Sequence, residues 1–416
     1  MQSMIGSLFG GAGAKVGRKV SKRKARRFRP TADGLEARLA MSLGGGFPIN
    51  VAPAVTTGVA SGSSSNGMSA LVWTEDYPNF VSAVLVQRFM HGGQLTAELG
   101  SPVLVDFVDL KGTKREYEPS IAFDAQGKFV VSWLTEDLNP KNVTTTIMAR
   151  RFDASGNPLG PSFVVNAGTL ARDAHVAADA AGNFVVAYTT NNLAITDIQA
   201  KLYNSAGGLV KVISVAATTK NASRSSVAMT ADGQFDIAYQ YAFSSTDSDV
   251  YMSRFSATGG LIGTSAVATS SASEGVPSVA VDDAGNAVVA YQKFAVAAGN
   301  SSESIGVRRV TSAGVVSAEM ILPSKGIYAI SPSVAVKRTG GAFVVGYVTT
   351  PAFGEFYTPT DYVTEVNANN AVTGTFSVGT HQDSPAVSID GTNQYLVGTL
   401  DVLPAKNPHD RFGTLA

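Results

Sequence analysis

The sequence predicts an all-β fold, a seven-bladed β-propeller of four-stranded antiparallel blades. One type of segment recurs seven times in the 416 residues, and in most copies a glycine is followed six positions later by an aromatic residue. Neighbouring copies are 51 to 60 residues apart, and each contains short β-branched runs separated by Asp, Asn or Gly turns. Repeats of this length indicate radially arranged supersecondary units. The pairs are Gly67 and Trp73, Gly127 and Trp133, Gly182 and Tyr188, Gly233 and Tyr239, Gly285 and Tyr291, Gly341 and Tyr347, and a degenerate Asn393 and Thr399.

Each repeat is expected to form four strands in chain order. In the second copy, an alternating first strand at 120–124 leads through an Asp/Gly turn to a more apolar second strand at 129–133. A third strand ends at Arg151 and Phe152, and a fourth follows at 163–166. We expect the Trp or Tyr of the second strand to pack between blades, because a buried aromatic ring removes a large apolar area from water.

The two ends of the chain are expected to close the ring. The seventh repeat stops at Ala416 before a fourth strand, whereas residues 46–51 are similar to the fourth-strand segment 161–166. If the amino-terminal strand completes the last blade, no strand edge stays exposed. The predicted organisation is a basic sorting segment at 1–45, without regular structure, and a propeller at 46–416.

Charge is distributed unevenly along a chain whose formal net charge is zero. Residues 1–29 contain nine Lys or Arg residues and no acid, which leaves 23 basic against 32 acidic residues in the rest of the chain. Cysteine is absent, so neither disulfides nor thiolate metal sites are available. No run of apolar residues is long enough to cross a bilayer. A nucleic-acid partner is not expected, because that interpretation rests only on the basic segment.

The basic segment resembles a known export signal. A basic run, Arg26-Arg27-Phe28-Arg29-Pro30, is followed by Gly34-Leu35-Glu36-Ala37-Arg38-Leu39-Ala40-Met41-Ser42. This pattern is similar to the planctomycete amino-terminal sorting segment of the LEPR-XLL type, with Ala40-Met41 where that family usually has two leucines. The resemblance implies an extracellular or cell-surface protein. The alternative is a basic tail that binds polyanions without specificity.

The repeats also resemble a known type. The segments Gly182-Asn-Phe-Val-Val-Ala-Tyr188 and Phe163-Val-Val-Asn166 are similar to the propeller-like repeats of bacterial secreted and RTX-associated surface proteins. The likeness spans residues 47–416 and implies architecture and location, but no chemistry.

Candidate ligand-binding residues lie in the connections that vary in length between repeats, since variable loops on a rigid scaffold often carry function. The connection Pro351–Asp361 contains Phe353, Glu355, Phe356 and Tyr357, which suit stacking on a sugar ring or packing into a cluster of their own. Glu136 and Asp137 occupy a loop position equivalent to that of Glu75 and Asp76, so acids of adjacent blades could converge as glycosidase chemistry requires.

Other catalytic and metal signatures are missing. The four histidines have no metal-ligand spacing, and no Gly-x-Ser-x-Gly elbow occurs. The turn acids Asp124, Asp179 and Asp282 offer too few oxygens for calcium and are interpreted as turn formers. No catalytic residue, cofactor or metal ion is assigned on this basis.

These observations favour a secreted or cell-surface, non-catalytic binding module. Its expected partner is a glycan or another cell-envelope protein, and the chain is expected to be a monomer. The alternative is a propeller hydrolase or lyase that cleaves polysaccharide with loop carboxylates.

Overall fold

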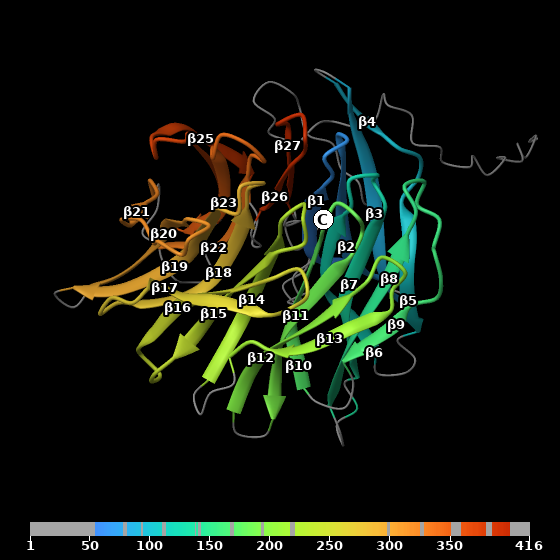
Figure 1. Ribbon diagram of the computed structural model, residues 1–416, viewed down its shortest axis with the longest axis horizontal. Helices are drawn as coiled ribbons and strands as arrows, with labels where there is room; N and C mark the ends of the chain where they lie inside the picture. The colour runs from blue at the N-terminus through green and yellow to red at the C-terminus, as the bar shows by residue number, and fades with distance from the viewer. Residues whose placement is uncertain are drawn as a thin grey trace, which may run out of the picture. The chain divides into compact units, whose positions relative to one another are not determined.

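The computed structural model of the chain is all-β in the parts that it describes (Figure 1). In these parts, no helix has the length and apolar character needed to cross a bilayer. The described residues are 55–77, 81–92, 95–109, 114–137, 139, 143–166, 170–192, 195–216, 221–297, 300–324, 328–350, 359–379 and 385–399.

Consecutive strands pair in antiparallel order, and each group of paired strands matches one sequence repeat. We number these groups as sheets 1 to 7 in chain order. Sheet 1 contains β1 (Val55–Ser63), β2 (Met68–Tyr77), β3 (Val81–Gly92), β4 (Leu95–Glu98) and β5 (Val103–Asp109). Sheet 2 contains β6 (Lys114–Phe123), β7 (Phe129–Asp137), β8 (Thr144–Phe152) and β9 (Phe163–Asn166). Sheet 3 contains β10 (Leu170–Ala178), β11 (Phe184–Asn192), β12 (Ile195–Tyr203) and β13 (Leu209–Ser214).

The later repeats follow the same order. Sheets 5 and 6 are joined by a single parallel residue pair, Glu303 with Tyr328. Sheet 4 contains β14 (Asn221–Met229), β15 (Phe235–Ala242), β16 (Ser248–Phe255) and β17 (Leu261–Ala268). Sheet 5 contains β18 (Ser273–Val281), β19 (Ala287–Ala297), β20 (Asn300–Val310) and β21 (Met320–Ile321). Sheet 6 contains β22 (Tyr328–Val336), β23 (Phe343–Thr350), β24 (Thr360–Val366) and β25 (Val372–Gly379), and sheet 7 contains β26 (Ala386–Ile389) and β27 (Tyr395–Gly398).

The turn between the first and second strands recurs with the same hydrogen bonds. Asp124 Oδ1 accepts from the backbone N–H groups of Gln126 and Lys128 at 2.9 and 2.8 Å, and Gly127 takes a φ of 84°. Glycine adopts this left-handed conformation without the steric cost of a Cβ atom. Asp179 and Asp282 make the corresponding bonds. The interpretation of these acids as turn formers is confirmed.

The aromatic residue of each second strand is buried in the core. Trp133, Tyr188, Tyr291 and Tyr347 are 0 % exposed, and Trp73 is 2 % exposed. Burial of a whole aromatic ring removes a large apolar area from water. The predicted packing role of the aromatic position is confirmed.

The first strands of neighbouring sheets pack on one another. Contacts join β1 with β6, β6 with β10, β10 with β14, β14 with β18, β18 with β22, β22 with β26, and β26 with β1. Four of these junctions share one hydrogen bond, from a valine N–H to the serine Oγ of the preceding sheet. The bonds are Val176 to Ser120 (3.1 Å), Val279 to Ser226 (3.2 Å), Val334 to Ser278 (3.1 Å) and Val387 to Ser333 (3.2 Å).

Sheets 1 and 7 are hydrogen bonded to each other. The Gly391 N–H donates to the Ser64 carbonyl at 3.1 Å, and Ser63 Oγ donates to Ser388 Oγ at 2.8 Å. The predicted closing strand at 46–51, and the boundary between residues 45 and 46, lie outside the described residues.

Candidate functional site

An irregular position recurs in five successive first strands. The pairing register shifts at this position, and one residue takes a positive φ between 47° and 55°. A side chain with a Cβ rarely adopts this conformation, and bulges of this kind redirect a side chain locally. We call this the left-handed position; its occupants are Glu118, Asp173, Arg224, Val276 and Ser331.

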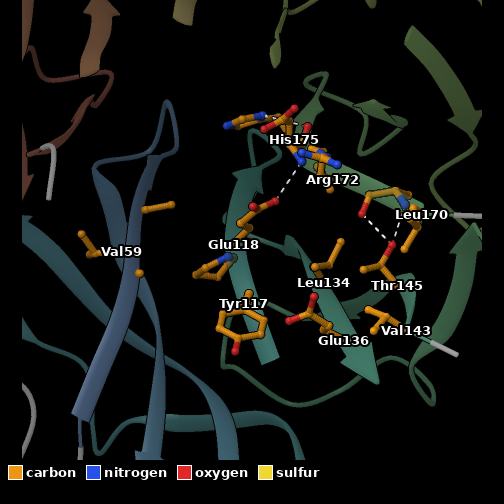
Figure 2. A pocket seen from close by; sticks show the side chains of 16 residues that line it. Val59, Tyr117, Glu118, Leu134, Glu136, Val143, Thr145, Leu170, Arg172 and His175 are labelled. Carbon is orange, nitrogen blue, oxygen red and sulfur yellow. Dashed lines mark hydrogen bonds between the residues drawn. The ribbon is translucent and has the colours of Figure 1, made fainter. Parts of the chain in front are cut away.

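The first two occupants line a cavity of about 840 Å³. Its walls come from β1, β6, β7, β8 and β10 (Figure 2). The lining residues lie towards those strand ends that border the connections of variable length. The charged or titratable lining residues are Glu118, Glu136, Arg172, Asp173 and His175, with Tyr117 beside them.

Glu118 joins sheets 2 and 3 across this cavity. Its Oε2 accepts a hydrogen bond of 2.8 Å from the backbone N–H of Asp173 (Figure 2). The surrounding protein raises the pKa of Glu118, because desolvation disfavours the charged form, and the nearby Asp173 carboxylate adds to the rise. The residue as a whole is nevertheless exposed, and it lines the cavity. Glu118 therefore combines access to a ligand with a stabilised protonated form, which is the combination that a general acid needs.

The Asp173 carboxylate is held in place from two sides. Its Oδ2 accepts from Thr189 Oγ1 at 2.9 Å and from the backbone N–H of Arg224 at 3.1 Å. Glu118, Asp173 and Arg224 belong to three successive sheets, and the carboxyl groups of the first two accept from the backbone N–H of the left-handed residue in the next sheet. Asp173 thus positions Glu118 by offering its own N–H.

Glu136 provides another carboxyl group on the cavity wall. It lies near the end of β7, directly across the strand pair from Arg115, whose positive charge it stabilises. The sequence placed Glu136 and Asp137 in a loop, but both belong to β7, because hairpin pairing with Thr145 and Thr144 of β8 continues through them. Asp137 is not among the lining residues of the cavity; its Oδ1 accepts from the Asn139 N–H at 3.1 Å.

The remaining predicted ligand-binding residues cannot be assigned a position. Phe353, Glu355, Phe356 and Tyr357 lie outside the described residues. Glu75, the predicted counterpart of Glu136, is only 3 % exposed and accepts a bond of 2.7 Å from Trp73 Nε1. The two acids are therefore not equivalent, since one holds a core tryptophan and the other lines a cavity.

Three residues of the cavity escaped the sequence analysis. Neither Glu118, Asp173 nor His175 is a candidate there. A signal was present: aligning the repeats on the first-strand serine puts an acid two positions before it in sheets 2 and 3. His175 stands at that serine position in sheet 3, is exposed, and lies 3.3 Å from the Asp173 carbonyl through its Nδ1.

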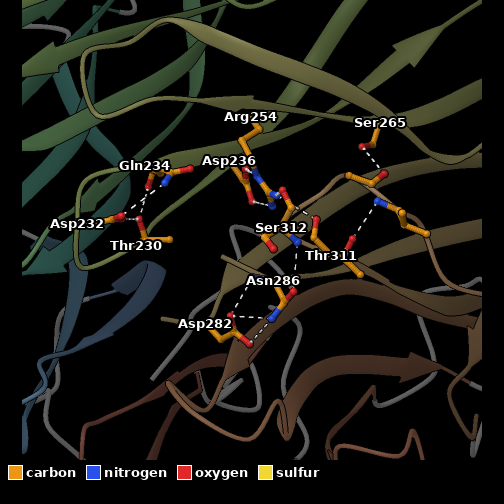
Figure 3. A network of polar contacts seen from close by, with 12 residues as sticks. Thr230, Asp232, Gln234, Asp236, Arg254, Ser265, Asp282, Asn286, Thr311 and Ser312 are labelled. Atoms are coloured by element: carbon orange, nitrogen blue, oxygen red, sulfur yellow. Dashed lines mark hydrogen bonds and ion pairs between the residues drawn. The ribbon is translucent and has the colours of Figure 1, made fainter. Parts of the chain in front are cut away.

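Another polar network lies at the opposite, constant ends of the strands and is structural. Arg254 bonds both carboxylate oxygens of Asp236 at 2.7 and 2.8 Å and also the carbonyls of Thr311 and Ser312 (Figure 3). Asp236 and Arg254 are 1 % and 8 % exposed, so no ligand reaches them. Among the described residues, no group of three or more His, Asp or Glu side chains is arranged to hold a metal ion.

Comparison with solved structures supports the fold. No protein-family model and no curated protein matches the chain. A protein of unknown function from Dyadobacter fermentans matches with a TM-score of 0.52 and 13% identity, over 74% of this chain and 94% of the other. The α-L-arabinanase of Penicillium chrysogenum, solved with arabinobiose, matches with a TM-score of 0.50 and 15% identity, over 81% of this chain and 98% of the other. At these identities the likeness shows a β-propeller type of fold.

The comparison corrects the prediction of a non-catalytic binding module. One of these two similar structures, the arabinanase, is an enzyme. The alternative drawn from the sequence, a propeller hydrolase or lyase, is the better supported of the two.

Proposed function

We propose that the chain is a propeller enzyme that cleaves polysaccharide by hydrolysis in the cavity between sheets 2 and 3. The observation that carries the proposal is Glu118, an exposed carboxyl with a raised pKa that shares a cavity of about 840 Å³ with Glu136. Most glycosidases use two carboxyl groups that flank the scissile bond, one of which acts as the general acid.

In the proposed reaction, Glu118 donates its proton to the glycosidic oxygen as the bond from this oxygen to the anomeric carbon breaks. Glu136 accepts a proton from the water molecule that attacks the anomeric carbon. The products are a free reducing end and an alcohol, with Glu118 left as carboxylate and Glu136 as carboxylic acid. Exchange of one proton with solvent restores both groups. Asp173 acts by positioning Glu118 through the 2.8 Å hydrogen bond.

The test is a depolymerisation assay of the full chain on a panel of plant, algal and bacterial polysaccharides. Release of new reducing ends is expected, and Glu118→Gln should reduce it by roughly 100-fold or more, because general acid catalysis contributes on the order of 10²–10⁴. Ultraviolet absorbance of an unsaturated product would instead indicate a lyase. Absence of any cleavage across the panel, or full activity in Glu118→Gln, would overturn the proposal.

Glu303→Gln is the matched control. Burial raises the pKa of Glu303 as it does that of Glu118, but Glu303 lies in β20 and is not among the cavity residues. Replacement of Glu303 should leave cleavage unchanged. This result would show that the loss seen in Glu118→Gln is specific to Glu118 and does not follow from removing any desolvated carboxyl group.

The proposal includes a closed, seven-bladed ring. Contacts of β26 with β1 support it, as does a channel of about 420 Å³ lined by residues of all seven first strands. It also includes export of a monomeric enzyme to the cell surface or medium, supported by the LEPR-XLL-like segment at 26–42. Mass spectrometry of the cell surface and medium tests export, and retention of the protein inside the cell would contradict it.

A further inference from the structure

Two arginines differ from the others in the described residues. Eight of the ten described arginines are bonded to protein groups: Arg88, Arg150, Arg151 and Arg309 to backbone carbonyls, Arg308 to a carbonyl and a tyrosine hydroxyl, Arg115 to Tyr117, and Arg254 and Arg338 to carboxylates. For Arg172 and Arg224, no described residue bonds the guanidinium group.

Both unbonded arginines line the connected cavities of the proposed site. Arg172 lines the 840 Å³ cavity beside Glu118, and its positive charge partly offsets the rise in the pKa of Glu118. Arg224 lines the 420 Å³ channel. The two cavities share Asp173 and His175 in their walls. Arg224 also occupies the left-handed position that Glu118 and Asp173 occupy in the two preceding sheets.

An unbonded arginine on a convex surface is usually a solvated charge. These two lie instead on concave walls, where water is confined and a bound anion would be partly desolvated. The raised pKa of Glu118 reduces the negative charge of the same wall. The walls of the two cavities carry Arg172 and Arg224 together with the carboxyl groups of Glu118, Glu136 and Asp173, so the two arginines are the groups available to pair with anionic substituents of a ligand.

We propose that this site takes an anionic polysaccharide, and that Arg172 and Arg224 bind the carboxylate or sulfate groups of its sugars. This inference rests on the proposed function and names its substrate class. The planar guanidinium fork matches both oxyanions and binds them through two parallel hydrogen bonds. Arg172, beside Glu118, sets the sugar at the cleavage point, and Arg224 binds the sugar that extends into the channel.

The test measures binding without turnover, so that its failure is distinct from failure of the proposed function. The full chain carrying Glu118→Gln is titrated calorimetrically with polygalacturonate, with carboxyl-reduced polygalacturonate of the same length, and with carrageenan. At least one of the two anionic polymers should bind at least tenfold more tightly than the neutral one, and its binding should weaken with salt. Preference for polygalacturonate assigns a uronate, and preference for carrageenan assigns a sulfate ester.

Arginine variants in the same background complete the experiment. Arg172→Gln and Arg224→Gln should each weaken binding of the anionic polymer by about tenfold or more, which is typical of losing a charge-assisted hydrogen bond. Arg338→Gln, which removes an arginine already paired with Asp283 outside the cavities, is the control and should bind normally. Equal binding of neutral and anionic polymers, or unchanged binding in both cavity variants with unchanged melting temperatures, would overturn the inference.

Discussion

The left-handed position is the same in sheets 2 to 4 as in sheets 5 and 6, but its side chains differ. The φ angles of Glu118, Asp173 and Arg224 are 48°, 54° and 55°, and those of Val276 and Ser331 are 47° and 53°. The backbone conformation is thus a property of the repeat. Only sheets 2 to 4 use it to present charged groups to a cavity.

This difference shows that backbone conformation and side-chain chemistry vary independently at this position of the strand. A left-handed residue with a side chain is strained by on the order of 1–3 kcal/mol, and all five sheets carry this cost. The shared strain therefore says nothing about function by itself. The chemistry follows from which side chain stands there and from its neighbours, such as Thr189 beside Asp173.

The largest expected effect concerns Glu116, which lies two residues before Glu118 and, unlike Glu118, is only 1 % exposed. Desolvation raises the pKa of Glu116 from 4.5 to about 8. Its stabilising contribution is thus complete below pH 4.5 and is lost as the pH rises to about 8. Glu116→Gln should remove this dependence, at roughly 1.4 kcal/mol per pH unit, and so raise stability by a few kcal/mol at alkaline pH.

Denaturant unfolding of the full chain at several pH values checks this expectation. Parallel stability curves for wild type and Glu116→Gln would refute it. Since the Thr135 hydroxyl that bonds Glu116 can also bond a glutamine, the substitution preserves the local packing.

A smaller effect is expected where the left-handed residue is bonded to its neighbours. Asp173→Ala removes the acceptor of two hydrogen bonds and should cost about 2 kcal/mol of stability. It should also lower kcat, because these two bonds hold the left-handed backbone that presents the Asp173 N–H to Glu118. Asp173→Asn, which tolerates the left-handed conformation, should recover part of both. At the equivalent position, Ser331→Ala should cost less than about 1 kcal/mol, and similar losses at 173 and 331 would contradict the comparison.

The smallest effect concerns His175, which stands where sheets 2, 4, 5 and 6 have the serine that accepts from the next sheet. His175→Ser would supply this acceptor for Val227 and should stabilise the protein by about 0.5–1 kcal/mol. Thermal denaturation measures the gain, and a drop in cleavage should accompany it. A destabilised variant would show that the histidine itself supports sheet 3.

Much of the fold was predictable because its signals are local and repeated. The Gly-to-aromatic spacing, the Asp turns and the segment 163–166 each gave the correct element, since period-2 patterns and turn residues act within a few positions. The candidate site was harder to predict from the sequence. A bulge shifts the side-chain alternation by one residue, so the period-2 pattern gave no signal for Glu118 or Asp173. Their proximity depends on contact between β6 and β10, which no local pattern encodes.

The most direct test of Glu118 as the acid that cleaves a glycosidic bond is its dependence on the leaving group. Turnover by the full chain and by Glu118→Gln is compared on the cleaved polysaccharide and on an aryl glycoside of the same sugar, whose phenolate leaves without a proton. The account predicts a loss of roughly 100-fold or more on the polysaccharide and a loss of less than about tenfold on the aryl glycoside. Equal losses on both substrates would contradict it.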